Sequence, residues 1–111
     1  MSTMNDLTIP LSALDFTSDS TASATADDWT VIQVGVLLQA VVENHARSLL
    51  TEGDVHSVSV TFDVSADAVS GTQVEFESRI DRKTRTLVFA SGIAKQNDRH
   101  LLKATVVFRI G

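Results

Sequence analysis

The longest apolar stretch of the chain runs over residues 29–50, and three of its polar side chains fall on a single line. Gln39, Glu43 and Arg47 are spaced by four, which places them on one face of a helix. The remaining positions are largely aliphatic and cover much of the helical wheel. This pattern predicts a long helix within residues 28–51 that is buried on most of its circumference.

The ends of this helix are marked less clearly than its middle. Gly53 follows the last apolar residues and is a natural stop. At the start, residues from Thr25 to Asp28 have the spacing of a capping box. Gly35 then falls inside the helix, where glycine costs about 1 kcal/mol relative to alanine.

From Val55 onward the apolar period changes from 3.6 to two. Turn residues separate the alternating segments at Ser70-Gly71, at Arg82-Lys83-Thr84 and at Asn97-Asp98. We therefore expect a meander of four long antiparallel strands after the helix, over residues 55–65, 73–80, 85–94 and 102–110. The fold class predicted from this order is α+β.

The first 26 residues are predicted to form a loop and edge-strand segment, followed by a single domain over residues 27–111. The run 18–25 is rich in Ser, Thr and Ala and is expected to be loop. Residues 7–11 form a candidate edge strand, where Pro10 is tolerated.

A single helix can cover one face of a sheet, and the sheet must curl around the helix to keep that apolar face away from water. The strand over residues 85–94 is apolar on both faces, because Leu87, Phe89 and Ile93 alternate with other apolar residues. With Leu101 and Val107 they form a candidate apolar patch on the outer face. Such a patch and long edge strands favour association, so we expect a homodimer or a homotetramer.

The composition excludes several classes of function. The 111 residues contain no Cys, carry a net charge of −5 and have no apolar run of 18 residues. Disulfides, thiolate zinc sites, membrane-spanning helices and general nucleic-acid binding are therefore not expected. The three histidines lack metal-ligand spacing, so no metal site is expected. The first six residues lack the pattern of a secretory signal, which leaves the cytoplasm as the expected location.

Residues 33–111 resemble the small hotdog-fold acyl-CoA thioesterases of the phenylacetate-pathway and 4-hydroxybenzoyl-CoA type. In that family the central helix opens with His-Gly-Gly and carries an acid two turns later. Gly35 matches the first glycine and Glu43 falls at the position of the acid. Ser70-Gly71-Thr72 stands where the family has a Pro-Gly-Asp-like turn, and Arg85-Thr86 matches an Arg-Thr pair in the next hairpin.

The resemblance implies a hotdog fold, thioester hydrolysis and a set of site residues. Glu43 would act as general base or nucleophile, and the Gly35 amide would stabilise the carbonyl oxygen at the start of the helix. Ser57 would assist from a partner subunit. Coenzyme A would enter only as part of the acyl thioester substrate, with its phosphates held by cationic residues of one hairpin. Those residues are Arg82, Lys83 and Arg85.

Other interpretations of the same residues stay open. Val34 and Val36 replace the histidine and the second glycine of the family motif. The alternative is therefore a catalytically inactive hotdog dimer that binds an acyl thioester or serves as an assembly module. Glu43 also has the spacing of a surface ion pair with Arg47, and Gly35 allows close helix packing. Ser57 suits the solvated face of a strand, and the charged hairpin suits solvent. A different cone-shaped α+β fold with the same element order would instead place its pocket inside one subunit.

Overall fold

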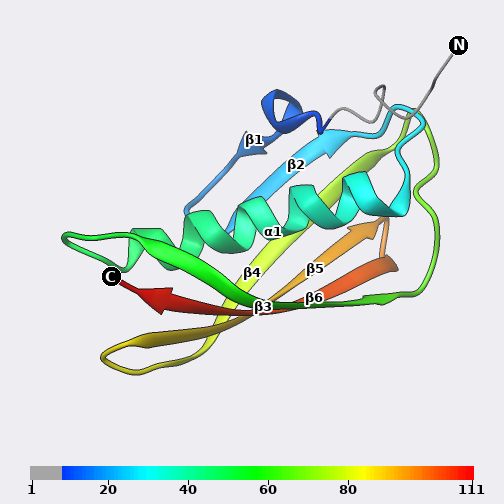
Figure 1. Cartoon of the computed structure of the whole chain (residues 1–111). Coiled ribbons are helices and arrows are strands. Elements are labelled where there is room, and N and C mark those ends of the chain that lie inside the picture. Colours follow the sequence, from blue (N-terminus) through cyan, green and yellow to red (C-terminus); the bar gives the residue numbers. More distant parts are fainter. Residues whose placement is uncertain (1–8) are drawn as a thin grey trace, which may run out of the picture.

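The computed structural model describes residues 9–111 as one helix packed on one face of a six-stranded antiparallel sheet (Figure 1). The elements are the 3-10 helix η2 (Leu11–Ala13), β1 (Asp15–Phe16), β2 (Thr21–Thr25), α1 (Val31–Ser48), β3 (Val55–Val64), β4 (Gln73–Lys83), β5 (Leu87–Gln96) and β6 (Arg99–Ile110). This confirms the predicted α+β class and the single long helix.

The strand order is β1-β2-β4-β5-β6-β3, so the four long strands do not form a simple meander. Of the four long strands, only β4, β5 and β6 are joined as consecutive neighbours, whereas β3 pairs with β6 at the far edge of the sheet. The connection after β3 is anchored where Ser65 and Ala66 donate their amides to the carbonyl of Leu101. The predicted adjacency of β3 and β4 was wrong because a local alternation pattern does not encode strand order.

The helix starts at Val31 because Thr30 and Gln33 form a capping box. The Thr30 hydroxyl accepts from the Gln33 amide at 3.2 Å, and the Gln33 side chain accepts from the Thr30 amide at 2.8 Å. The candidate capping box at residues 25–28 does not start the helix, since Thr25 ends β2. The helix ends at Ser48, so Gly53, with φ +85°, serves the turn into β3 and not the helix stop.

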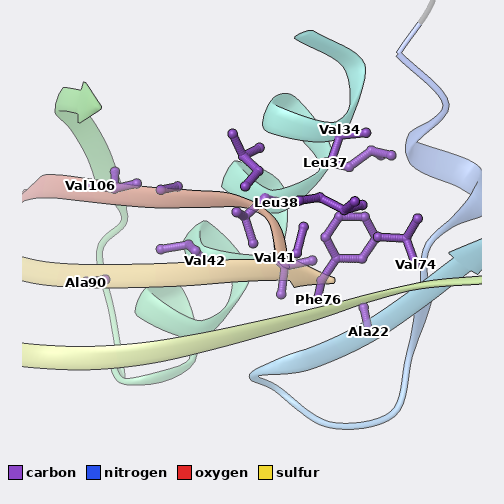
Figure 2. Close-up of a cluster of buried hydrophobic side chains, with 14 of the residues drawn as sticks. Ala22, Val34, Leu37, Leu38, Val41, Val42, Val74, Phe76, Ala90 and Val106 are labelled. Atoms are coloured by element: carbon purple, nitrogen blue, oxygen red, sulfur yellow. The ribbon is translucent and has the colours of Figure 1, made fainter. Parts of the chain in front are cut away.

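The core lies between α1 and the sheet (Figure 2). Leu37, Leu38, Val41 and Val42 of the helix are fully buried. They face apolar side chains from the strands, among them Val74, Phe76, Ala90 and Val106. Seven of the 18 helix residues are buried, all on the side of α1 that faces the sheet. The prediction that most of the circumference is buried is therefore wrong, because a single sheet covers only one side of the helix: Val36 and Ala40 stay partly exposed and Ile32 is 60% exposed.

Residues 21–25 form strand β2, so the loop predicted for residues 18–25 is wrong over this part. Ala22 opposes Phe76 and Ala24 opposes Val74, and both alanines are buried. Their small side chains gave little hydrophobic signal, although they alternate with hydroxyl residues. The edge strand predicted for residues 7–11 begins outside the described residues, and Leu11 starts the 3-10 helix instead.

The outer face of the sheet carries most of the predicted apolar patch. Four residues of the patch are half-buried there: Leu87, Phe89, Ile93 and Val107. Phe89 of β5 lies directly opposite Val107 of the neighbouring strand β6. Leu101 is not part of this patch. It is 1% exposed and lines a recess with residues of the connection after β3.

Candidate functional site

The polar stripe of α1 lies beside β3, the edge strand of the sheet. We call the line of contact the α1–β3 seam. On the helix it consists of Gly35, Gln39, Glu43 and Arg47, spaced by four residues. Gly35 and Gln39 contact β3, and Arg47 contacts Asp54, the residue just before β3.

Two contacts define the first half of the seam. The Phe62 ring lies where a side chain on Gly35 would begin, with its Cε1 3.3 Å from an ideal Cβ position on that glycine. One turn further, the Gln39 side chain donates from Nε2 to the Ser57 hydroxyl at 3.4 Å. Gln39 was part of the predicted polar stripe but was not predicted as a site residue.

Ser57 reaches the seam because β3 contains a bulge between Ser57 and Ser59. Ser57 opposes Phe108, whose side chain is in the core, whereas Ser59 opposes Val107 on the outer face. An extra residue shifts the alternation by one and moves later side chains to the other face. The alternative that places Ser57 on the solvated outer face of the strand is therefore wrong, and Ser57 lies on the helix side of β3.

Arg47 closes the other end of the seam. Its Nε donates to Asp54 Oδ1 at 2.7 Å, and its Nη2 lies 3.5 Å from Glu43 Oε1. Asp54 Oδ1 also accepts the Val55 amide at 2.8 Å. The hydrogen bond from Arg47 and the one from Val55 lower the pKa of Asp54, while the bond to Asp54 raises the pKa of Arg47.

Glu43 lies between these two polar pairs, with 35% of its side chain exposed. Within residues 9–111 its one ion-pair partner is Arg47. The carboxylate is thus held from one side by a cation and remains accessible to water. That arrangement suits proton transfer from a water molecule as well as the surface ion pair considered from the sequence.

Gly35 does not provide the free amide expected of it. It is the fifth residue of α1, and the helical ladder already begins with the Val34 amide donating to Thr30 at 3.1 Å. The Gly35 amide therefore lies beyond the unpaired first turn. In the described chain, the first-turn amides without an acceptor are those of Val31 and Ile32. The position of Gly35 against Phe62 instead supports close packing.

Arg82, Lys83 and Arg85 are exposed at the turn between β4 and β5. A bulge places Arg82 opposite Phe89, on the outer face, and Lys83 opposite the buried Val88. None of the three has an ion-pair partner among the residues that the structure describes. They lie at the end of the sheet where the chain ends, but no contact joins them to the seam.

The Arg47–Asp54 pair predicts a pH-dependent contribution to stability. Because the pKa of Asp54 is lowered in the folded protein, the pair stabilises the fold above the unfolded value, about 3.9. This contribution is lost as the pH falls through the lowered pKa. We expect Asp54→Asn to melt at a lower temperature than the wild type at pH 7, with the difference shrinking as the pH falls below about 3.9.

Asp27→Asn is the matched control, since Asp27 is exposed and has no ion pair in the described structure. Thermal unfolding of the three proteins between pH 2 and 7 measures the effect. A constant difference between Asp54→Asn and the wild type over this whole range would show that the charge of Asp54 is not involved.

No family model matches the chain, and no curated protein matches it in sequence. Solved structures do match. A Ralstonia eutropha protein, described as a candidate thioesterase related to phenylacetic acid degradation, has 16% identity and a TM-score of 0.76, over 92% of this chain and 91% of that one. The chain has the hotdog fold. S. sahachiroi AziG shares this hotdog fold, with 15% identity, a TM-score of 0.81 and coverage of 99% and 96%.

A third hotdog structure was solved with coenzyme A. It is a Streptococcus pneumoniae protein described as a hypothetical thioesterase, with 10% identity and a TM-score of 0.75, over 87% of this chain and 86% of that one. These likenesses confirm the predicted hotdog fold. Within residues 9–111 of this hotdog chain, no helix is long and apolar enough to cross a membrane, and no three acidic or histidine side chains gather as metal ligands.

Proposed function

We propose that the chain hydrolyses a small acyl-CoA or aryl-CoA thioester, with Glu43 as the catalytic carboxylate. The observation that carries this proposal is the position of Glu43. It is a partly exposed carboxylate on the helix, between Gln39 and Arg47 on the line that faces β3. Two hotdog proteins similar to this chain are described as thioesterases, and one of them holds coenzyme A.

The chemistry needs a base for water and donors for the carbonyl oxygen. Glu43 accepts a proton as a water oxygen attacks the thioester carbon, or it attacks that carbon itself as a nucleophile. The Gln39 amide and the Ser57 hydroxyl, joined at 3.4 Å, are donors one helical turn away. In the first route the carbon–sulfur bond then breaks, and the departing thiolate takes up the proton held by Glu43. In the second route the thiolate leaves as an anhydride forms on Glu43; a water molecule then hydrolyses the anhydride, which frees the acid and Glu43, and the proton released goes to the thiolate.

We further propose that the complete site forms between two copies of the chain. Val31 precedes Glu43 by 12 residues, which is about 18 Å along an α-helix. One chain therefore does not bring the free amides of its helix start to its own Glu43. The edge of β3 is unpaired among the described strands, and Val58 and Val64 are more than half exposed on it. Pairing of two such edges produces a homodimer.

The phosphates of coenzyme A are proposed to bind at the β4–β5 turn. Arg82, Lys83 and Arg85 are exposed and have no acidic partner among the described residues. Guanidinium and ammonium groups are the usual protein partners of phosphate oxygens. No cofactor is part of this proposal beyond the coenzyme A of the substrate.

A panel of aliphatic and aromatic acyl-CoA thioesters tests the proposal. We expect thiol release, followed with a chromogenic thiol reagent, that exceeds the uncatalysed rate for at least one class of acyl group. Light scattering on the same sample is expected to give a mass of two chains or four. Shifts in melting temperature without turnover would support the inactive binding module instead, and the absence of both effects would contradict either function.

A further inference from the structure

Phe62 occupies the space that Gly35 leaves open on the seam. Its Cε1 and Cζ atoms lie 3.3 and 3.4 Å from the position of an added Cβ on Gly35, and Leu102 Cδ2 lies at 3.6 Å. Phe62 is nevertheless 39% exposed. A large aromatic ring is thus held in a defined place while one side of it faces solvent.

A small apolar recess lies at the same end of the seam, near the start of α1. It is lined by Val31, Val34, Val64, Ala66, Ala68 and Leu102, with Leu101 below. Leu102 contributes both to this recess and to the surroundings of Gly35. The free volume is about 10 Å³, which is room for about one water molecule. As it stands, the recess has no room for a hydrocarbon chain.

The seam therefore changes character along its length. Its Glu43 end carries carboxylate, amide and hydroxyl groups, and its Phe62 end is bordered by hydrocarbon. Gly35 and Glu43 are separated by eight residues, about 12 Å along the helix. A ligand with a polar carbonyl and an apolar tail matches this gradient when its carbonyl lies near Glu43.

We propose that the acyl tail of the substrate lies along the α1–β3 seam with its far end against Phe62, and that Phe62 sets the longest acyl group accepted. This inference rests on the proposed function and adds the class of acyl group. The tails accepted are apolar at their far end, because Phe62 and Leu102, which surround Gly35, offer no polar group to a hydroxyl or carboxyl group.

Straight-chain acyl-CoA substrates of increasing length test this inference. For the wild type we expect kcat/KM to fall sharply beyond a certain length. Phe62→Ala is expected to raise kcat/KM for the next longer substrates by about tenfold or more, the usual effect of one accommodated methylene group, and to leave the shortest substrate within about twofold. Phe16→Ala is the matched control, because it removes an aromatic ring of similar exposure, 43%, from β1 at the opposite edge of the sheet. It should keep the wild-type profile.

Gly35→Ala in the Phe62→Ala background provides the reverse change. The added methyl group enters the space that the ring has left, so we expect the length limit to move back toward shorter substrates. A length profile of Phe62→Ala that parallels the wild type would overturn the proposal, as would a Phe16→Ala profile that shifts equally.

Binding of S-alkyl-CoA thioethers separates this inference from the proposed hydrolysis, since thioethers are not hydrolysed. Titration calorimetry is expected to show affinity falling beyond the same chain length in the wild type and persisting to longer chains in Phe62→Ala. This binding result without turnover would contradict the proposed hydrolysis and support the acyl site at Phe62. Turnover with a length limit that is the same in the wild type and in Phe62→Ala would support the hydrolysis and contradict the acyl site.

Discussion

Glu43→Gln is expected to lower kcat for acyl-CoA hydrolysis by about 10²- to 10⁴-fold, the range in which a general base contributes. The amide keeps the size and shape of the side chain but cannot take a proton from water. Its effect on the fold should be small. The ion pair between Glu43 and Arg47 is 3.5 Å long and both side chains are well exposed, so its loss costs less than about 0.5 kcal/mol.

The expected loss of activity is large and the expected loss of stability is small, so activity distinguishes the two interpretations of Glu43. As a catalytic carboxylate, its replacement removes activity without changing the melting temperature by more than a few degrees. As a surface partner of Arg47, its replacement changes neither. Glu75→Gln is the control, because Glu75 is an exposed carboxylate on β4, away from the α1–β3 seam, opposite Lys95. Activity of Glu43→Gln equal to that of Glu75→Gln would exclude Glu43 from the mechanism.

The helix could be predicted from the sequence because its signal is local and repeated. The spacing of Gln39, Glu43 and Arg47 follows directly from the helical period, and the structure places all three on one seam. The first turn was harder to predict. Thr30 and Gln33 carry a capping signal as suitable as that at Thr25, and only the pairing of β2 with β4 decides between them.

The side of the strand on which Ser57 lies depends on information that is not local. The alternation around Val58 is regular in the sequence, so a period of two predicts an unbroken strand. The bulge arises where β3 pairs with β6, a strand about 45 residues further along the chain. The same long-range pairing places β3 at the sheet edge, where it lies beside the polar stripe of α1. The seam is therefore a product of the topology as much as of its residues.

Gly92→Val is expected to destabilise the protein by about 3 kcal/mol, at the upper end of the usual cost of overpacking a core. Gly92 lies on the face of β5 that α1 covers. A Cβ there would lie 2.6 Å from Val42 Cγ2 and 2.8 Å from Leu38 Cδ1. Leu38 and Val42 are both fully buried, so neither side chain has free space to move into. The helix and the sheet would have to separate.

Strand propensity works in the opposite direction, because valine is favoured over glycine in a strand by up to about 1 kcal/mol. The clash should outweigh this gain, and we expect the melting temperature to fall by roughly 10–15 °C. If Gly92→Val does not fold, Gly92→Ala gives the same sign with a smaller shift. Thr105→Val, on the exposed face of β6, raises strand propensity without a clash and should change stability by less than about 0.5 kcal/mol. Equal melting temperatures for Gly92→Ala and the wild type would mean that α1 does not approach β5 this closely. The position of Gly35, Gln39 and Glu43 beside β3 depends on how closely α1 packs on the sheet. A larger distance between α1 and β5 would therefore also change the geometry of the proposed site.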